Sequence, residues 1–331
     1  MIQPAGAAVQ NRSTAKKVLH IVLKIIAAFI ILVLLFIAVV FTVNKASSYS
    51  EQKRTDHYGQ LVPVDGKQMN VFIEGQGKET IVLLPGYGTA APALDFKPLI
   101  SELSPYYKVV VVEPFGYGLS DQTGKERTTA NIVSEIHEAL QSLHIDRYIL
   151  MAHSISGLYS LDYVNQYSNE VSAYIGLDSS VPALREQRIT SSDTKPVKWF
   201  RDLGFARVQL KLSPDAYEGL PYDEHTLDQI NILMRKNMYN PTQLNEAVSM
   251  YANYDAAEQQ SFPANLPVLF FLQENHPVTD QWVPEHEKQI EDSLQGEIIL
   301  LDADHYLYRS HSAEISEKIR GFTDQNTNRA L

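Results

Sequence analysis

The sequence predicts an α/β fold: a mostly parallel central sheet with helices on both faces, a helical cap insertion, and one apolar helix ahead of the domain. Short, wholly apolar runs alternate with segments of helical spacing, the pattern of buried parallel strands covered on both faces. The 331 residues, 44% of them hydrophobic, suffice for a full-sized core. Residues 182–263 keep helical spacing but offer no strand run, which indicates an insertion over one end of the sheet.

Composition excludes several classes of function. The chain carries 28 Lys and Arg against 39 Asp and Glu, a formal charge of −11. This balance argues against nucleic acid as a partner, which needs a basic face. Cysteine is absent, so disulfides, thiolate metal sites and cysteine nucleophiles are excluded.

The N-terminal region predicts a membrane anchor. Residues 25–43 are uncharged and span about 28 Å as a helix, close to the roughly 30 Å of a hydrocarbon core. Residues 1–24 contain no acid but four basic residues, Arg12, Lys16, Lys17 and Lys24. The positive-inside rule therefore predicts a cytoplasmic N-terminus and a single-pass cell-membrane protein with its large domain outside. A cleaved signal peptide is the alternative, although its apolar region usually has only ~7–15 residues.

The remaining elements follow from local patterns. Residues 44–58 are polar and predict a linker, 59–323 form the main domain, and 324–331 are a tail. Asp65-Gly66 predicts a hairpin between the first two strands. Within the insertion, Asn240-Pro241 predicts the start of a helix after the helical spacing of 226–238. Strands are expected at 60–64, 68–74, 80–84, 108–112, 148–151, 171–177, 268–272 and 297–301, and helices at 94–103, 128–143, 155–167, 285–294 and 313–322.

A candidate nucleophile lies where a strand runs straight into a helix. Ser154 stands at this joint, and a serine in such an elbow presents its Oγ at the top of the sheet. The positions two before and two after it, Ala152 and Ser156, are small, as the close approach of strand and helix requires. An ordinary turn with a serine N-cap is the alternative interpretation.

Four motifs occur in a fixed order along the chain, and together they are more specific than any one alone. They are Leu83-Leu84-Pro85-Gly86-Tyr87-Gly88, Glu113-Pro114-Phe115-Gly116-Tyr117-Gly118-Leu119-Ser120-Asp121, Ala152-His153-Ser154-Ile155-Ser156-Gly157, and Asp304-His305. By their order and spacing the sequence resembles the α/β-hydrolase superfamily over about residues 58–323. It departs from the family pattern at Pro85 (for His), Glu113 (for Asp), and Ala152 and Ser156 (each for Gly).

An oxyanion hole follows from the same motifs. Acyl transfer builds negative charge on a carbonyl oxygen, and fixed N–H donors must stabilise it. One donor is the backbone N–H of Ile155, directly after the candidate nucleophile. The other, by the resemblance, is the backbone N–H of Tyr87. A tight turn is the simpler interpretation of Gly86-Tyr87-Gly88.

His305 is the candidate general base. Serine activation needs a neutral imidazole within hydrogen-bond reach of the hydroxyl. Among ten histidines, His305 alone follows a final strand in a short loop before the last helix, where the family's catalytic histidine lies.

The acid that orients this imidazole is the least constrained residue. In most of the family it follows the strand that is here 268–272, but His276 stands at the expected position. Glu274 and Asp280 are nearby substitutes. Asp178, at the end of the preceding strand, is the candidate we favour, because haloalkane dehalogenases and some lipases of the superfamily use that position. A solvated loop acid or helix cap is its alternative role.

These residues predict a membrane-anchored serine hydrolase that cleaves an acyl bond of a small-molecule substrate, without metal or organic cofactor. The insertion is rich in Tyr and Met and contains Trp199, which favours an ester or lipid substrate, although such residues equally form a cap's own core. An aminopeptidase-type amide hydrolase is the second interpretation. A non-catalytic ligand-binding protein is the third, and a cell-envelope scaffold the fourth. The sequence identifies no protein partner.

Overall fold

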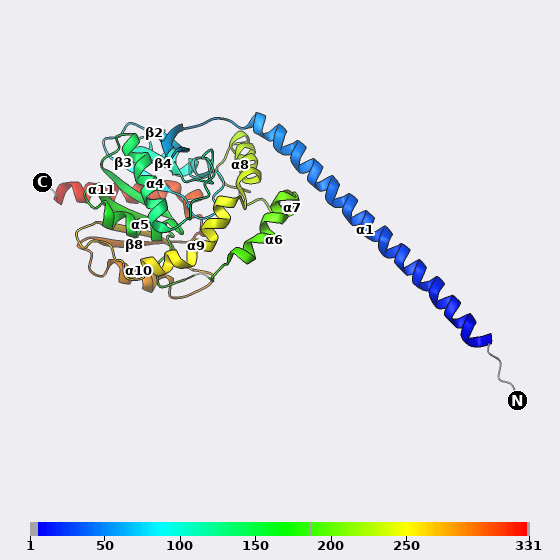
Figure 1. Cartoon of the computed structure of the whole chain (residues 1–331). Coiled ribbons are helices and arrows are strands. Elements are labelled where there is room, and N and C mark those ends of the chain that lie inside the picture. Colours follow the sequence, from blue (N-terminus) through cyan, green and yellow to red (C-terminus); the bar gives the residue numbers. More distant parts are fainter. Residues whose placement is uncertain (1–5, 186, 330–331) are drawn as a thin grey trace.

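The structure, a computed structural model, describes residues 6–185 and 187–329. One long helix leads into a compact α/β domain (Figure 1). The elements follow in the order α1 (Gly6–Arg54), β1 (Gln60–Val64), β2 (Lys67–Glu74), β3 (Thr80–Leu84), α2 (Pro92–Asp95), α3 (Lys97–Leu103), β4 (Lys108–Glu113), α4 (Thr129–Ser142), β5 (Tyr148–His153), α5 (Ser156–Gln166), β6 (Val171–Leu177), α6 (Ser191–Asp202), α7 (Phe205–Leu212), α8 (Glu224–Asn237), α9 (Pro241–Ala257), β7 (Val268–Gln273), α10 (Trp282–Ile290), β8 (Gly296–Leu301), η1 (Leu307–Arg309) and α11 (Ser312–Arg329).

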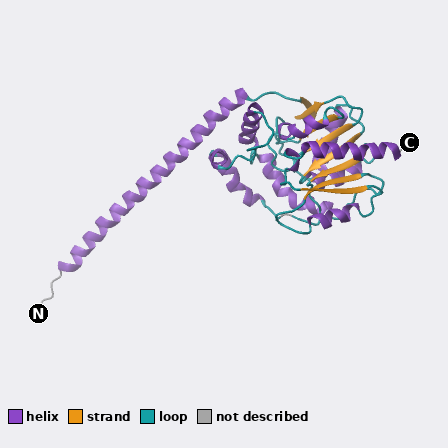
Figure 2. Ribbon diagram, turned by 180° about the vertical axis from the view of Figure 1, so that it is seen from behind, coloured by secondary structure: helices purple, strands orange, loops and turns teal. Residues whose placement is uncertain are grey.

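The eight strands form one mixed sheet of order β1-β2-β4-β3-β5-β6-β7-β8. The β1–β2 hairpin is antiparallel and joins β4 in antiparallel register. All pairs from β4 to β8 are parallel. This confirms the predicted α/β fold, with the strands lying between two helical layers (Figure 2).

Each parallel strand supplies side chains to two cores, because successive residues of a strand point to opposite faces. In β3, Val82 and Leu84 enter the core beneath α4 and α5. Ile81 and Leu83 enter the opposite core beneath α3 and α11. Both strand faces are therefore dry, which explains the unbroken apolar runs in the sequence.

Four helices, α6 to α9, form the cap and fill the region predicted as a helical insertion. The side chain of Asn240 accepts hydrogen bonds from the backbone N–H groups of Thr242 (2.9 Å) and Gln243 (3.0 Å), and Pro241 follows it in the first turn of α9. The side chain of Asp223 caps α8 through the N–H of Thr226. Each of these side chains starts a helix by accepting from N–H groups of its first turn.

Helix α1 extends further than the sequence predicts. The segment 44–58, expected as a linker, is helical up to Arg54 and becomes a loop only after it. A helix that is already nucleated extends at little cost through residues such as Ala, Ser, Glu and Lys, and cap contacts described below stabilise its last turns. In the described part of the chain, α1 is the one helix long and apolar enough to cross a membrane, by length and composition.

Other boundaries also differ from expectation. The helix expected at 94–103 is divided into α2 and α3, and the helix expected at 285–294 is α10, which starts at Trp282. The closing helix α11 continues to Arg329 through most of the expected tail. Residues 1–5 of the expected N-terminal segment and residues 330–331 of the tail lie outside the described residues.

Candidate active site

Three loops at the carboxyl edge of the sheet bring the candidate residues together. Ser154 follows β5, Asp178 follows β6, and His305 follows β8. Carboxyl ends of parallel strands share one edge, where α/β sheets place their sites. Ser154 and Asp178 both have positive backbone φ angles, 54° and 45°. Such conformations cost on the order of 1 kcal/mol or more for a residue with a side chain, and they aim both side chains at the same point.

The side chains of Ser154, His305 and Asp178 form a continuous chain of hydrogen bonds. His305 Nε2 lies 2.9 Å from Ser154 Oγ, and His305 Nδ1 lies 2.6 Å from Asp178 Oδ2. The carboxylate accepts, so we assign the ring proton to Nδ1. Nε2 is then the acceptor that faces the serine hydroxyl.

Asp178 is fully buried, and β7 and α10 hold it from the side opposite His305. The backbone N–H and side-chain Nε2 of Gln273 donate to its two oxygens, at 3.1 and 2.5 Å. Trp282 Nε1 donates to Oδ1 at 2.8 Å. Burial by itself raises the pKa of Asp178, but the bonds from His305 and Gln273 outweigh it and hold the pKa below its ordinary value.

The other two candidate acids do not reach the imidazole. Glu274 and Asp280 are exposed, and the carboxylate that His305 contacts is that of Asp178. His276 has a different role: its ring stacks on Trp282 with centroids 4.3 Å apart. Its Nδ1 accepts a hydrogen bond of 3.2 Å from the N–H of Thr279. The β7 loop therefore supplies packing and donors around Asp178.

His153 is buried beneath the loop that carries His305. Its ring bonds to the backbone of that loop. His153 Nε2 donates to the carbonyl oxygen of His305 at 2.9 Å. Burial, together with the nearby His305, lowers the pKa of His153 to about 3. His153 is thus a neutral donor that fixes the position of the His305 backbone.

The loop after β3 packs directly on the elbow. A Cβ added to Gly86 would lie 2.9 Å from Ser154 Cβ and 2.6 Å from His153 Nδ1, so only glycine allows this approach. Ser156 Oγ donates to the carbonyl oxygen of Pro85 at 2.5 Å. Two departures from the family pattern thus contact each other. Tyr87 and Ile155, the predicted oxyanion-hole residues, directly follow Gly86 and Ser154 in these two packed loops.

The third departure, Glu113, is part of the core. This buried carboxylate accepts hydrogen bonds from Tyr58, Asn70 and the N–H groups of Ala93 and Leu119. A Cβ on Gly118 would overlap it at 1.7 Å. Glu113 therefore organises the turn after β4.

Several cap aromatics belong to the protein's interior. Tyr254 and Met250 are buried against α4 and α5. Tyr217 is buried and donates to Asp95 at 2.7 Å. Asp95 also pairs with Arg309, which follows His305 in the chain, at 2.7 Å. These contacts join the cap to the rest of the domain, whereas Trp199 is 68% exposed. Tyr217 and Tyr254 therefore attach the cap to the domain.

Sequence reasoning missed four residues of this site: His153 as a donor, Ser156 as a tie to Pro85, Gln273 and Trp282. His153 and Ser156 lie inside the elbow motif, so the sequence places both of them close to Ser154. Gln273 and Trp282 reach Asp178 from other elements, and no local spacing predicts that. Among the described residues, no group of three His, Asp or Glu side chains could hold a metal ion.

The strand order, the elbow and the position of the three loops define an α/β-hydrolase fold. A model of the alpha/beta hydrolase family matches residues 81–318, and the chain belongs to that family. A curated relative, the uncharacterized protein YbdG of Bacillus subtilis (strain 168), is 31% identical over 265 residues, which cover 77% of this chain and 80% of that protein.

Two solved structures are similar in fold. One is the epoxide hydrolase VrEH1 from Vigna radiata, with a TM-score of 0.62 and 16% identity, covering 80% of this chain and 97% of that one. The other is the enol-lactonase from Burkholderia xenovorans LB400, with a TM-score of 0.56 and 15% identity, covering 80% and 100%. At these identities the likeness concerns the fold.

Proposed function

We propose that the chain is a membrane-anchored serine hydrolase that cleaves an acyl bond through Ser154, His305 and Asp178. The observation that carries the proposal is the relay of two hydrogen bonds, 2.9 Å from Ser154 Oγ to His305 Nε2 and 2.6 Å from His305 Nδ1 to Asp178. A hydroxyl, an imidazole and a buried carboxylate in this order are what general-base activation of a serine requires.

The reaction runs in two halves. Ser154 Oγ attacks the substrate carbonyl carbon while its proton passes to His305 Nε2. The imidazolium, stabilised by Asp178, then gives this proton to the leaving oxygen, and an acyl-enzyme remains. A water molecule next loses a proton to His305 and attacks the acyl carbon. The carboxylic acid is released, and Ser154 regains its proton from His305.

The negative oxygen of each tetrahedral intermediate needs donors that are already in place. We assign this role to the backbone N–H groups of Tyr87 and Ile155. The contact of Gly86 with the elbow and the Ser156–Pro85 hydrogen bond support the assignment, because they fix the two loops against each other.

A carboxylic ester or lipid is the substrate class we favour. VrEH1 is named an epoxide hydrolase, but a serine that opened an epoxide would be left as an ether, which the same relay does not hydrolyse. The enol-lactonase is named for an ester-type substrate, and an acyl-enzyme suits that chemistry. A membrane anchor also places the domain where esters of fatty acids are abundant.

The proposal includes the division of the chain. Residues 25–43 span the cell membrane, residues 1–24 are cytoplasmic, and the hydrolase domain of residues 59–323, with its cap at 182–263, is extracytoplasmic. The helical segment after residue 43 connects anchor and domain, and residues 324–331 end the chain. The uncharged run and the four basic residues ahead of it support this orientation.

The test is covalent labelling of the detergent-solubilised full-length chain with a fluorophosphonate probe. We expect labelling of the wild type and none of Ser154→Ala. His305→Ala should label far more slowly, because the serine is no longer activated. Ser142→Ala, at an exposed serine, is the matched control and should label like the wild type.

A substrate panel then separates the reaction classes. Faster turnover of p-nitrophenyl acyl esters than of aminoacyl p-nitroanilides supports an esterase or lipase, and the reverse order supports an aminopeptidase-type enzyme. A folded wild type that neither labels nor turns over any of these substrates contradicts the proposal and favours a binding protein.

A further inference from the structure

The cap presents an unusual apolar surface on α6 and α7. No residue of α6 is buried, and only Ala206 is buried in α7. Large apolar side chains therefore face outward from both helices. We call four of them the α6–α7 face: Trp199 (68% exposed), Phe200 (37%), Val208 (38%) and Leu212 (80%). Exposed apolar groups gathered on adjacent helices mark a surface that contacts something other than water.

This part of the cap lies beside α1, including the uncharged run of α1. The aromatic rings of Phe36 and Phe205 have centroids 6.2 Å apart. Gly204 approaches α1 so closely that a Cβ there would lie 2.6 Å from Asn44 Cβ and 3.1 Å from the carbonyl oxygen of Val40. Phe36 and Val40 belong to the run 25–43 for which we propose a membrane location.

The covered residues of α1 form one stripe along the helix. Partly buried positions recur at Ile37, Val40, Asn44, Ser47 and Glu51, a spacing of three and four residues that keeps them on one face. Ile37 precedes Val43, the end of the uncharged run, by about 9 Å of helix. Helices α6 and α7 pack along this stripe, so they reach about as far into the proposed membrane segment as Ile37 does. Interfacial helices lie at a similar depth in a bilayer, roughly 5–10 Å.

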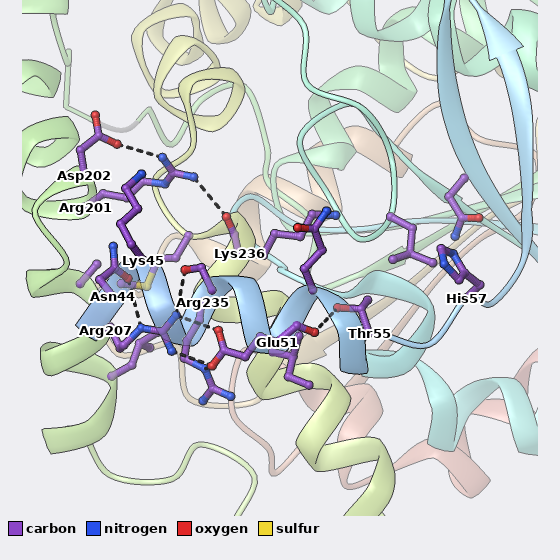
Figure 3. Close-up of a pocket in the computed structure, with 18 of the residues that line it drawn as sticks. Asn44, Lys45, Glu51, Thr55, His57, Arg201, Asp202, Arg207, Arg235 and Lys236 are labelled. Atoms are coloured by element: carbon purple, nitrogen blue, oxygen red, sulfur yellow. Dashed lines mark hydrogen bonds and ion pairs between the residues drawn. The ribbon is translucent and has the colours of Figure 1, made fainter. Parts of the chain in front are cut away.

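Polar contacts hold the cap against the C-terminal part of α1, which follows the uncharged run (Figure 3). Glu51 Oε1 forms ion pairs with Arg207 Nη1 at 2.6 Å and with Arg235 Nε at 2.7 Å. Arg207 Nε also donates to Asn44 Oδ1 at 3.1 Å. Burial raises the pKa of Glu51, but the two arginines outweigh it and hold the pKa below its ordinary value. Glu51 therefore stays charged near neutral pH and keeps α7 and α8 on α1.

The charge around the face fits a lipid surface with anionic headgroups. Apart from Arg207, which is paired with Glu51, helices α6 and α7 carry four basic side chains, Lys195, Lys198, Arg201 and Lys211, against the acids Asp193 and Asp202. This local excess of positive charge stands out in a chain whose formal charge is −11. Basic residues beside exposed Trp, Phe and Leu side chains are typical of helices that lie in a membrane interface.

We propose that the α6–α7 face docks into the interface of an anionic bilayer, beside the point where α1 leaves the membrane. The inference rests on the membrane anchoring proposed above. It adds that the cap itself contacts lipid, so that the hydrolase domain lies against the membrane surface. An acyl substrate then reaches the domain from the bilayer, and the favoured substrate class is a membrane lipid.

Tryptophan fluorescence tests the docking, because the chain contains only two tryptophans. Trp199 is exposed on the proposed face, whereas Trp282 is buried beside Asp178. The full-length protein is reconstituted into vesicles of phosphatidylcholine and phosphatidylglycerol whose acyl chains carry bromine near the carboxyl end. We expect bromine to quench wild-type emission relative to unbrominated vesicles. Trp199→Phe, which retains only Trp282, should lose this quenching.

The outcomes separate this inference from the proposals on which it rests. Quenching that requires Trp199 and is stronger with phosphatidylglycerol than with phosphatidylcholine alone supports it. Equal emission in brominated and unbrominated vesicles, from protein that floats with the vesicles, overturns the docking while the anchor stands. Protein that does not float with vesicles overturns anchor and docking together. Fluorophosphonate labelling of the same samples reports on Ser154 independently of either result.

Discussion

The indole Nε1 of Trp282 donates a hydrogen bond of 2.8 Å to Oδ1 of Asp178. Trp282 begins α10, which follows the strand from which most α/β-hydrolases take their acid. In this chain the loop between β7 and α10 instead surrounds an acid from the neighbouring strand β6, since Gln273 donates from the end of β7. This loop therefore supplies hydrogen-bond donors to the carboxylate of the proposed site, and the carboxylate itself comes from the end of β6.

The first prediction concerns the choice of acid. Asp178→Asn removes the charge that fixes the His305 tautomer, so we expect kcat with an ester substrate to fall by roughly 10³- to 10⁴-fold. Asp280→Asn and Glu274→Gln are the matched controls, and both should keep kcat within about twofold because these side chains are exposed. A large loss in either control with normal activity in Asp178→Asn would assign the acid to the β7 loop.

A second prediction concerns Trp282 as a positioning residue. Trp282→Phe keeps a ring for His276 to stack on but removes the N–H that Asp178 accepts. The carboxylate then interacts more strongly with the imidazolium, because no indole N–H competes for its negative charge. The acid limb of the kcat/KM profile should therefore move to higher pH. We expect kcat to fall by roughly 10- to 100-fold, the scale of one lost hydrogen bond to a charged group, because the carboxylate is less firmly positioned. A variant with lower activity but an unmoved acid limb would mean that the indole only fills space.

The fold was accessible from sequence because its signals are local. Apolar runs such as 108–112 and 171–177 have the length and composition of buried strands, and all eight strands lie within two residues of their predicted ends. The elbow at Ser154 and the loop of His305 were placed by motif order. Their meeting could be inferred only because parallel strands end at one edge.

Long-range features were not accessible in the same way. The segment 44–58 has a linker composition, and it is helical to Arg54 because Glu51 pairs with Arg207 and Arg235, more than 150 residues away. Likewise, sequence left Asp178, Asp280 and Glu274 as alternatives. Only geometry shows which carboxylate the imidazole contacts.

A third prediction tests the contact between Pro85 and Ser156, two of the four departures from the family pattern. Ser156→Ala removes the donor to the buried carbonyl of Pro85, and an unpaired buried acceptor costs about 1–3 kcal/mol of folding free energy. The loop that carries Tyr87 should also become less well placed, so fluorophosphonate labelling should slow. Ser142→Ala, on the surface, should change neither quantity. Normal stability and labelling in Ser156→Ala would show that the loop needs no such tie.

A fourth prediction concerns the ion pair between Asp95 of α2 and Arg309, which joins α2 to the segment after His305 and which the cap contacts through Tyr217. Both side chains are buried, and Tyr217 and Tyr308 donate to the same carboxylate. Asp95→Asn leaves the guanidinium without its counter-charge, which should cost about 3–5 kcal/mol of unfolding free energy. Tyr217→Phe keeps the ion pair but removes a hydroxyl that donates to Asp95 and accepts from Arg309 Nη2 at 3.2 Å, and it should cost about 1.5–3 kcal/mol. Equal and small losses in both variants would indicate that water replaces the pair.

The last prediction follows from the depressed pKa of His153. In the folded protein this pKa is about 3, whereas an unfolded histidine titrates near 6.5. Between these values the unfolded chain binds one more proton than the folded chain. Folding stability therefore rises with pH across this window and falls as the pH is lowered below about 6.5. From there to pH 5, His153 alone should remove about 2 kcal/mol.

Replacement by glutamine isolates this effect from every other titrating group. In His153→Gln the amide Nε2 can still donate to the His305 carbonyl, but the side chain no longer titrates. The difference in unfolding free energy between wild type and His153→Gln, measured by denaturant titration in detergent at pH 7 and pH 5, should therefore change by about 2 kcal/mol in favour of the variant at pH 5. His57→Gln, at an exposed histidine, is the matched control. If the difference between wild type and His153→Gln is the same at both pH values, His153 is not held neutral beneath the loop, and the constraint on the His305 backbone must come from elsewhere.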